Sequence, residues 1–229
     1  MNRIAFLLCL TLSASSYAQI SASTRPISLD DLERLHDVGS PAISPDGKWI
    51  VYTVSSSSTA PAPDNDRHVS ALWMISWDGT QQVRLTWDTE SASDPRFSPD
   101  GKYISFTSPR PGSAKGSQVW VLNRLGGEAE QWTNVKQDLG GYEWSPDSRH
   151  LVLKLREKDQ PEPEAGKPAA PPKPIVLDRY HFKQDRQGYL TDKAHDELYL
   201  FDVATKKLEK LTTDKNVDES DPAWSPDGK

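Results

Sequence analysis

Residues that could perform acid–base, nucleophilic or metal chemistry are scattered along this 229-residue chain and form no known catalytic motif. None of the five histidines stands at the spacing of a zinc site, and no His-Glu-x-x-His occurs. No Gly-x-Ser-x-Gly nucleophile elbow and no glycine-rich phosphate loop is present. The acidic run at 64–66 lacks the glycine and bidentate glutamate of a calcium loop, and the acidic residues over 214–221 suggest calcium just as weakly, so both are expected to be polar surface. The sequence therefore predicts no catalytic residue, no metal site and no cofactor in this chain.

The pattern that organises the chain is a repeated pentamer, Ser-Pro-Asp-Gly-Lys. It begins at Ser44, Ser98 and Ser225, and a degenerate copy begins at Ser145. In such a segment Pro presets φ, Asp can accept a hydrogen bond from its own backbone, and Gly adopts the positive φ that closes a turn. Alternating apolar residues flank the copies, so each predicts a β-hairpin.

The spacing around the pentamer fixes a longer repeat. A third strand carries an aromatic residue and a fourth strand ends in Thr, always 13 residues later (73 to 86, 120 to 133, 199 to 212). From that Thr to the next repeat Ser the distance is 12, 12 and 13 residues (86 to 98, 133 to 145, 212 to 225). All the variation in length therefore lies between the second and third strands, as expected of a surface loop above a shared core.

Four antiparallel strands in units of about 40 to 50 residues are typical of a β-propeller blade. We therefore expect an all-β fold for residues 19–229: an incomplete propeller of about three blades and the start of a fourth. Of the eight Trp residues, Trp77 and Trp87 lie just outside the predicted strands. The other six fall on strand positions, where we expect them to fill space between blades and not to form a ligand cage: Trp49, Trp73, Trp120, Trp132, Trp144 and Trp224. One short helix is predicted over 28–38, with Ser28 as its N-cap, Asp31 at the capping-box position and Gly39 as its end.

The N-terminus has the organisation of a secretory signal peptide over residues 1–18. Arg3 supplies the basic start, residues 4–12 form an apolar run too short to span a bilayer, and Ala18 precedes the expected cleavage before Gln19. The only cysteine, Cys9, would leave with the signal. We expect a periplasmic or secreted protein that has no membrane contact after cleavage. The formal net charge of −6 argues against nucleic acid as a partner.

The longest insertion, between the second and third strands of the third unit, has two parts. Residues 157–174 are rich in Pro and predict an extended or disordered segment. Residues 175–192 alternate polar and aromatic side chains around a turn at 185–188, which predicts a hairpin held out from the blade. The other blades pack without such an arm, so packing does not explain its presence. We therefore expect the arm to be functional.

The repeat resembles the propeller of secreted prolyl oligopeptidase family enzymes. The resemblance rests on Ser-Pro-Asp-Gly-Lys units preceded by residues 94–97 (Asp-Pro-Arg-Phe) or 221–224 (Asp-Pro-Ala-Trp), with Leu-Thr closing the blades. The combination of a signal peptide, a leading helix over 28–38 and the inserted residues 177–182 (Leu-Asp-Arg-Tyr-His-Phe) and 188–190 (Gly-Tyr-Leu) most resembles the acylaminoacyl-peptidase and dipeptidyl-peptidase-like branch. The resemblance covers about residues 27–229.

This resemblance implies a C-terminal α/β-hydrolase domain with a Ser-Asp-His triad, none of which lies in this chain. It implies that the propeller caps the active site, admits only short peptides and holds one peptide terminus with charged side chains. The Glu-Glu pair of dipeptidyl peptidases has no convincing match, because Glu143 stands alone. Arg179 and Tyr180, on the inserted arm, are the candidate substrate-binding residues. The alternative for Arg179 is an ion pair with Asp178 or Asp185 on a solvated hairpin.

The competing hypothesis is a non-enzymatic TolB-like periplasmic propeller that binds protein partners, because TolB-like propellers share the pentamer. The two hypotheses differ in the domain expected after Lys229 in the reading frame. A peptidase requires a hydrolase domain with a Gly-x-Ser-x-Gly elbow, whereas a binding module requires only further blades.

Overall fold

A computed structural model provides the structure of the chain. It describes residues 25–32, 34–57, 68–87, 90–112, 116–156, 180, 183–184, 188–189, 195–214 and 217–228. The chain divides into two units, Met1–Arg34 and Leu35–Lys229, which are described separately below.

The first unit contains a single helical turn, α1 (Leu29–Leu32). The predicted capping interaction is present, since the Ser28 backbone N–H donates to the Asp31 carboxylate at 2.9 Å. The prediction of a helix over 28–38 is nevertheless wrong, because strand β1 already begins at Asp37. No helix in the described part of the chain is long and apolar enough to cross a membrane.

Two physical reasons account for the short helix. Leu29, on its predicted apolar face, is 81% exposed, so burial contributes little to a turn that is marginal by itself. Val38 and Gly39, which the sequence pattern places at the helix end, instead pair with Val54 and Thr53 of the next strand. Strand pairing thus decides the conformation of this segment.

The second unit contains three four-stranded antiparallel sheets, each made of strands that are consecutive apart from the inserted hairpin. The first sheet contains β1 (Asp37–Ile43), β2 (Trp49–Ser57), β3 (His68–Ser76) and β4 (Gln82–Arg84). The second contains β5 (Ser93–Phe97), β6 (Tyr103–Ser108), β7 (Gln118–Asn123) and β8 (Glu130–Gln131). The third contains β9 (Asp138–Trp144), β10 (His150–Arg156), β13 (Asp196–Asp202) and β14 (Leu208–Lys210). The predicted four-stranded antiparallel units are therefore confirmed.

Each Ser-Pro-Asp turn is held by the same small network of hydrogen bonds. In the second copy the Ser98 hydroxyl donates to the Asp100 carboxylate at 2.7 Å and accepts the Tyr103 backbone N–H at 2.9 Å. Gly101 adopts the positive φ of 71° that the turn requires. In the first copy, hydrogen bonds from the Ser44 hydroxyl and the Lys48 backbone lower the pKa of Asp46 to about 2.

The Thr that closes each blade explains the constant 13-residue spacing. The Thr133 hydroxyl accepts the backbone N–H of Val119, the residue before the aromatic of the third strand, at 2.8 Å. The equivalent bonds join Thr86 to Leu72 at 2.9 Å and Thr212 to Leu198 at 3.0 Å. Each fourth strand ends two residues before its Thr, so the side chain continues the pairing where the backbone ladder stops.

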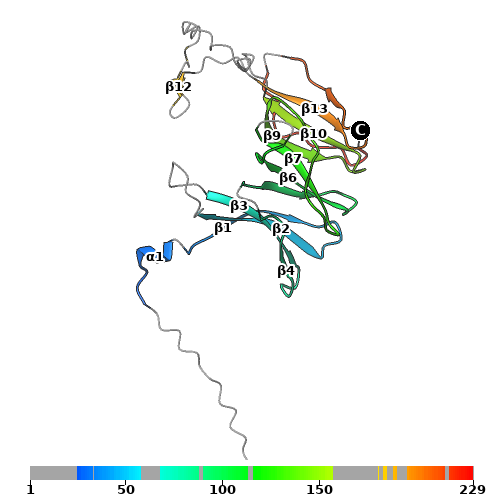
Figure 1. Cartoon of the computed structure of the whole chain (residues 1–229). Helices are drawn as coiled ribbons and strands as arrows, with labels where there is room; N and C mark the ends of the chain where they lie inside the picture. The colour runs from blue at the N-terminus through cyan, green and yellow to red at the C-terminus, as the bar shows by residue number, and fades with distance from the viewer. Residues whose placement is uncertain are drawn as a thin grey trace, which may run out of the picture. The chain divides into compact units, whose positions relative to one another are not determined.

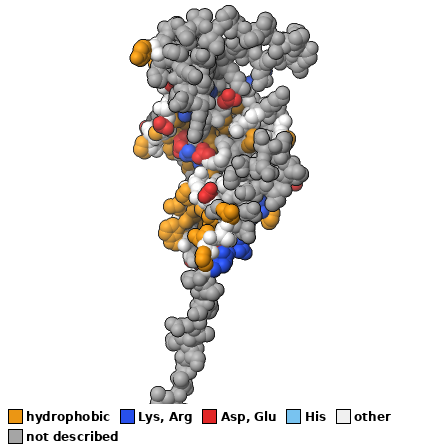
Figure 2. All heavy atoms as spheres, turned by 90° about the vertical axis from the view of Figure 1, so that its left-hand side faces the viewer, with side chains coloured by type: hydrophobic (Ala, Val, Ile, Leu, Met, Phe, Trp, Pro, Cys, Tyr) orange, Lys and Arg blue, Asp and Glu red, His pale blue; other side chains and the backbone are white. Residues whose placement is uncertain are grey.

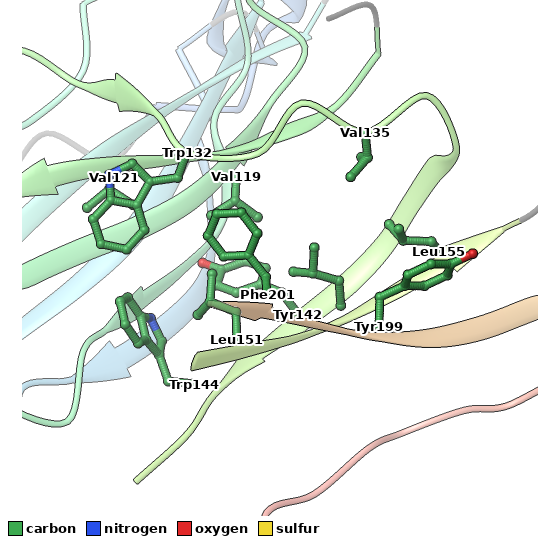
Figure 3. Packing of buried hydrophobic residues seen from close by; sticks show 11 residues of the cluster. Val119, Val121, Trp132, Val135, Tyr142, Trp144, Leu151, Leu155, Tyr199 and Phe201 are labelled. Atoms are coloured by element: carbon green, nitrogen blue, oxygen red, sulfur yellow. The ribbon is translucent and has the colours of Figure 1, made fainter. Parts of the chain in front are cut away.

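The three sheets pack against one another in chain order through two hydrophobic clusters (Figure 1). Trp132 and Trp144 meet edge to face, with ring centroids 5.8 Å apart, in the cluster between the second and third sheets (Figure 3). By contrast Trp77 and Trp87, predicted to lie just outside the strands, are 66% and 73% exposed. The buried indoles thus fill space between the sheets as expected.

The insertion in the third unit contains the predicted hairpin. Strand β11 (Lys183–Gln184) pairs antiparallel with β12 (Gly188–Tyr189), on either side of the expected turn. The Pro-rich segment 157–174 and the acidic run 64–66 lie outside the described residues.

Candidate functional site

The first strand of each sheet is an edge strand whose pairing is interrupted by a bulge. In β1 the register shifts between Gly39 and Ala42, and in β5 between Ser93 and Arg96. In β9 the extra residue is Gly140, which lies between the residues paired with β10. A bulge changes the direction of neighbouring side chains and is common beside functional sites.

The internal repeat identifies which bulge departs from the common pattern. Ser40, Asp94 and Asp221 occupy equivalent positions, each before a Pro, with φ values of 48°, 48° and 49°. The third unit has Gly141 and Tyr142 where the others have this Ser/Asp-Pro pair. Since the remaining units fold without this change, it points to a local role beyond the blade itself.

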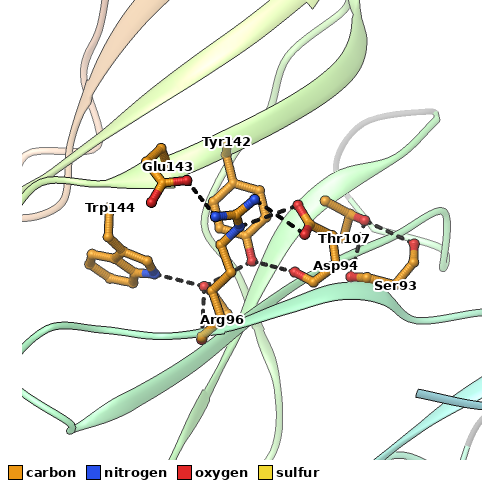
Figure 4. Close-up of polar contacts among 8 residues, drawn as sticks. Ser93, Asp94, Arg96, Thr107, Tyr142, Glu143 and Trp144 are labelled. Carbon is orange, nitrogen blue, oxygen red and sulfur yellow. Dashed lines mark hydrogen bonds and ion pairs between the residues drawn. The ribbon is translucent and has the colours of Figure 1, made fainter. Parts of the chain in front are cut away.

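The position after the Pro carries opposite charges in two adjacent units. It is Ala in the first and fourth units, Arg96 in the second and Glu143 in the third. Arg96 forms ion pairs with Glu143 and, at 3.4 Å, with Asp94 (Figure 4). The three side chains remain 35–40% exposed. Acidic and basic side chains lie close together on the face drawn in Figure 2.

The electrostatic surroundings keep the Arg96 guanidinium charged. Burial lowers its pKa, but the negative charges of Asp94 and Glu143 outweigh burial and raise it. The guanidinium also lies over the Tyr142 ring, 5.4 Å from the centroid. These contacts fix the position of Arg96 between the second and third sheets.

Beneath this charged layer lies a buried polar node around Ser105 of β6. The Trp144 indole N–H donates to the Ser105 hydroxyl at 2.8 Å. The Tyr142 hydroxyl lies 2.9 Å from the same oxygen and 2.8 Å from the Asp94 carbonyl oxygen. Burial raises the pKa of Tyr142, so its phenol stays neutral and donates a hydrogen bond.

The equivalent indole in the fourth unit, that of Trp224, lacks the acceptor that Ser105 offers to Trp144. The residue of β10 equivalent to Ser105 is Val152, whose side chain offers no acceptor. The Trp224 indole N–H is also buried but has no hydrogen-bond partner among the described residues. The contact between the second and third units therefore contains a buried hydrogen bond, from Trp144 to Ser105, that the described part of the contact between the third and fourth units lacks.

A cavity of about 290 Å³ lies beside these residues. It is lined by Asp94, Arg96, Gly140, Gly141, Tyr142, Glu143, Lys154, Asp221 and Pro222. A Cβ atom at Gly140 would lie 2.8 Å from Lys154 Cε, so a larger residue here would displace the end of the Lys154 side chain. The Lys154 ammonium in turn lies 3.9 Å from the Asp196 carboxylate.

The lining residues of the cavity suit the binding of a charged or polar ligand. Its lining offers carboxylates, cations and a neutral phenol, but no activated hydroxyl or thiol nucleophile. Within the described residues, no group of three or more His, Cys, Asp or Glu side chains could hold a metal ion. The site can recognise a charged or polar ligand.

Of the two residues proposed from the sequence, the structure describes only Tyr180. Tyr180 is fully exposed and does not line the cavity, whereas Arg179 lies outside the described residues. Sequence reasoning leaves Glu143 single because its partner Arg96 is 47 residues away. Aligning the repeats places Arg96 and Glu143 at the same blade position, and this is the signal that could have suggested the pair.

No protein-family model matches the chain. The chain is 30% identical over 205 residues to the uncharacterized peptidase YuxL of Bacillus subtilis. This match covers 89% of the chain and 30% of the relative, so the chain spans less than a third of that protein.

Solved structures share the fold. Acylaminoacyl peptidase of Pyrococcus horikoshii superimposes with a TM-score of 0.57 at 17% identity, over 78% of this chain and 25% of that one. TolB of Acinetobacter baumannii superimposes with a TM-score of 0.51 at 23% identity, over 83% of this chain and 35% of that one. With the blade architecture and the match to a bacterial peptidase, these findings confirm the resemblance: the chain is similar to the propeller portion of prolyl oligopeptidase family peptidases.

Proposed function

We propose that the chain is the N-terminal propeller part of a secreted serine peptidase that cleaves short peptides. A C-terminal hydrolase domain supplies the catalytic triad, and the propeller controls which substrates reach it. The observation that carries the proposal is the 30% identity to a peptidase across 89% of the chain. The absence of a nucleophile elbow from the sequence is consistent with catalysis in another domain.

In this proposal the three sheets are the first blades of a larger propeller. Propellers close with about 4 to 8 blades around a central channel. The hollow of about 630 Å³ beside Trp144 and Trp224, together with the Trp224 indole that lacks a partner among the described residues, supports the packing of further blade residues at this end. The bulged first strands then line the channel, which places Arg96 and Glu143 on the path of a substrate.

The location belongs to the same proposal. Arg3, the apolar run 4–12 and Ala18 support export and cleavage before Gln19. Sequencing the N-terminus of the mature protein should begin near Gln19. An intact Met1 in the cell's soluble interior would contradict the secreted location.

The activity is tested with the complete product of the reading frame that encodes this chain. We expect it to hydrolyse acyl-peptide or dipeptidyl substrates and to be labelled by a fluorophosphonate, which reacts with activated serines. A product that carries no hydrolase domain, takes no label and gives no turnover above a buffer blank would refute the proposal.

The second candidate is a TolB-like propeller that binds protein partners without catalysis. The superposition on Acinetobacter baumannii TolB supports it, but at 23% identity that likeness concerns the fold alone. Under this alternative the complete product contains only blades, and affinity capture from periplasmic extract returns a protein partner while fluorophosphonate labelling fails.

A further inference from the structure

The first sheet has one apolar face that the described residues leave partly uncovered. Its strands pair Tyr52 with Trp73 and place Ile50 between Ile43 and Ile75, so these five side chains lie on the same side of the sheet. We call this side the front face of the first sheet. Ile43 is 59% exposed, and the other four residues are partly exposed.

The internal repeat shows that the front face has the character of a core. The equivalent residues of the second and third sheets are all buried, with at most 9% of their surface exposed. In the second sheet they are Phe97, Ile104, Phe106, Trp120 and Leu122, and in the third sheet they are Trp144, Leu151, Leu153, Tyr199 and Phe201. The first sheet therefore carries apolar side chains at positions that the other two sheets bury.

In both described contacts between sheets, the front face is covered by the opposite face of the preceding sheet. Val51, Leu72 and Met74 of the first sheet lie in one cluster with the front face of the second sheet. Val119 and Val121 of the second sheet lie in one cluster with the front face of the third. Because repeat units bury their apolar faces against neighbouring units, the repeat predicts that another unit covers the first sheet.

Trp77 lies at the rim of the same uncovered face. Its backbone N–H donates to the Lys48 carbonyl oxygen at 2.8 Å, and Arg124 and Val203 make the equivalent bond in the second and third sheets. Both equivalents contact the preceding unit: the Arg124 guanidinium donates to Asp46 at 3.0 Å, and Val203 packs against the cluster between the second and third sheets. Trp77 is 66% exposed, since the described residues include no unit that precedes the first sheet.

Further units are added on the C-terminal side of the third sheet. The fourth turn is already formed, since the Ser225 hydroxyl donates to the Asp227 carboxylate at 2.7 Å and Gly228 has a φ of 71°. The relative YuxL is also much longer than the matched region, which covers 30% of it. A unit that follows the third sheet is therefore the one expected to return to the first sheet and complete a ring.

We propose that the last blade of the same chain covers the front face of the first sheet, and that Trp77 packs on the Ser-Pro-Asp turn of that blade. The inference rests on the larger propeller of the proposed function, but it does not depend on peptidase activity. The covering blade presents apolar residues at alternating positions of its second and third strands, as the first and second sheets do in the described contacts.

The direct test is hydroxyl-radical footprinting of the complete protein, which measures the accessibility of single side chains by mass spectrometry. Leu125, at the hairpin tip of the second sheet, is 97% exposed and is the accessible control, whereas the buried Trp132 is the protected control. After division by the intrinsic reactivity of each residue type, we expect Trp77 and Tyr52 to be as protected as Trp132. Reactivity of Trp77 as high as that of Leu125 would overturn the inference.

Two further measurements identify what covers the face. An amine-reactive cross-linker should join Lys48 to a lysine in the turn of the last blade, because the pentamer ends in Lys in three of its four copies. A cross-link from Lys48 to the hydrolase domain in its place would overturn the inference. Protection of Trp77 that disappears on dilution, as the mass in solution halves, would also overturn it, since a second copy would then be the cover.

Substitution of the rim residue tests whether the contact stabilises the ring. Trp77→Ala should raise the equilibrium constant for unfolding in urea at least about tenfold, because it removes a buried aromatic contact. The matched control Leu125→Ala should change this constant by less than about twofold. Equal effects of the two substitutions would contradict the proposed contact.

Peptide turnover is assayed in parallel, so that the two proposals can fail separately. A complete protein that protects Trp77 but shows no turnover supports the inference and refutes the peptidase. Turnover by a protein in which Trp77 stays as reactive as Leu125 overturns the inference and leaves the peptidase intact.

Discussion

Replacing Ser105 with Ala should weaken the contact between the second and third blades measurably. The Ser105 hydroxyl is fully buried and accepts the Trp144 indole N–H at 2.8 Å, while the Tyr142 hydroxyl lies 2.9 Å away. Trp144 and Tyr142 are themselves only 5% and 3% exposed, so water cannot replace the lost partner. The substitution removes one oxygen and leaves the surrounding hydrophobic cluster otherwise unchanged.

The expected loss follows from which donors are left unpaired. Within the described part of the chain the Trp144 indole has no second acceptor, and an unsatisfied buried donor costs about 1–3 kcal/mol. The Tyr142 hydroxyl retains the Asp94 carbonyl at 2.8 Å, so its loss is smaller, about 0.5–1 kcal/mol. Together these terms predict that Ser105→Ala lowers the free energy of unfolding by about 1.5–4 kcal/mol.

The assay is urea unfolding of the complete protein, followed by tryptophan fluorescence. Ser93→Ala, which removes an exposed hydroxyl that bonds Thr107, is the control and should cost less than about 0.5 kcal/mol. In a Trp144→Phe background, which has no indole N–H, Ser105→Ala should cost about 1 kcal/mol less than in wild type. A Ser105→Ala protein as stable as the Ser93→Ala control would refute the reasoning.

Three further predictions concern the closing Thr, the turn Asp and the inserted arm. Thr133→Val should lower the free energy of unfolding by about 1–3 kcal/mol in urea, because it leaves the buried Val119 N–H unpaired; the half-buried Thr212→Val should cost less, and equal losses would contradict this account. The pKa of Asp46 is lowered to about 2, so its stabilising effect is complete above the unfolded value of about 3.9 and disappears as pH falls toward 2. Asp46→Asn should therefore lose less stability than wild type between about pH 5 and pH 2.5. An equal loss in the variant and in wild type over this pH range would contradict the account. Deleting residues 175–192 from the complete protein should leave the fold intact but alter peptide cleavage or assembly; unchanged kinetics and unchanged mass in solution would argue against a functional arm.

The repeat in the sequence is sufficient to predict the sheets. Turn formation at Ser-Pro-Asp-Gly depends on neighbouring residues, and strand alternation has a period of two, so both are visible locally. The constant distance from Trp120 to Thr133 predicts a fixed connection, which the structure explains by the bond from the Val119 N–H to the Thr133 hydroxyl. The hairpin of β11 and β12 is predictable for the same local reasons.

Local reasoning failed where a non-local partner decided the outcome. The predicted helix over 28–38 has a correct capping interaction at Ser28, but β2 pairs with residues 37–39 and makes them a strand. Neither Arg96 nor Glu143 looks functional alone, since each is an ordinary charged residue on a strand. The sequence determined the blade and its turns, because these arise from contacts within one unit. Only the tertiary structure decided the charged cavity, because it forms where bulges in successive units bring side chains 47 residues apart into contact.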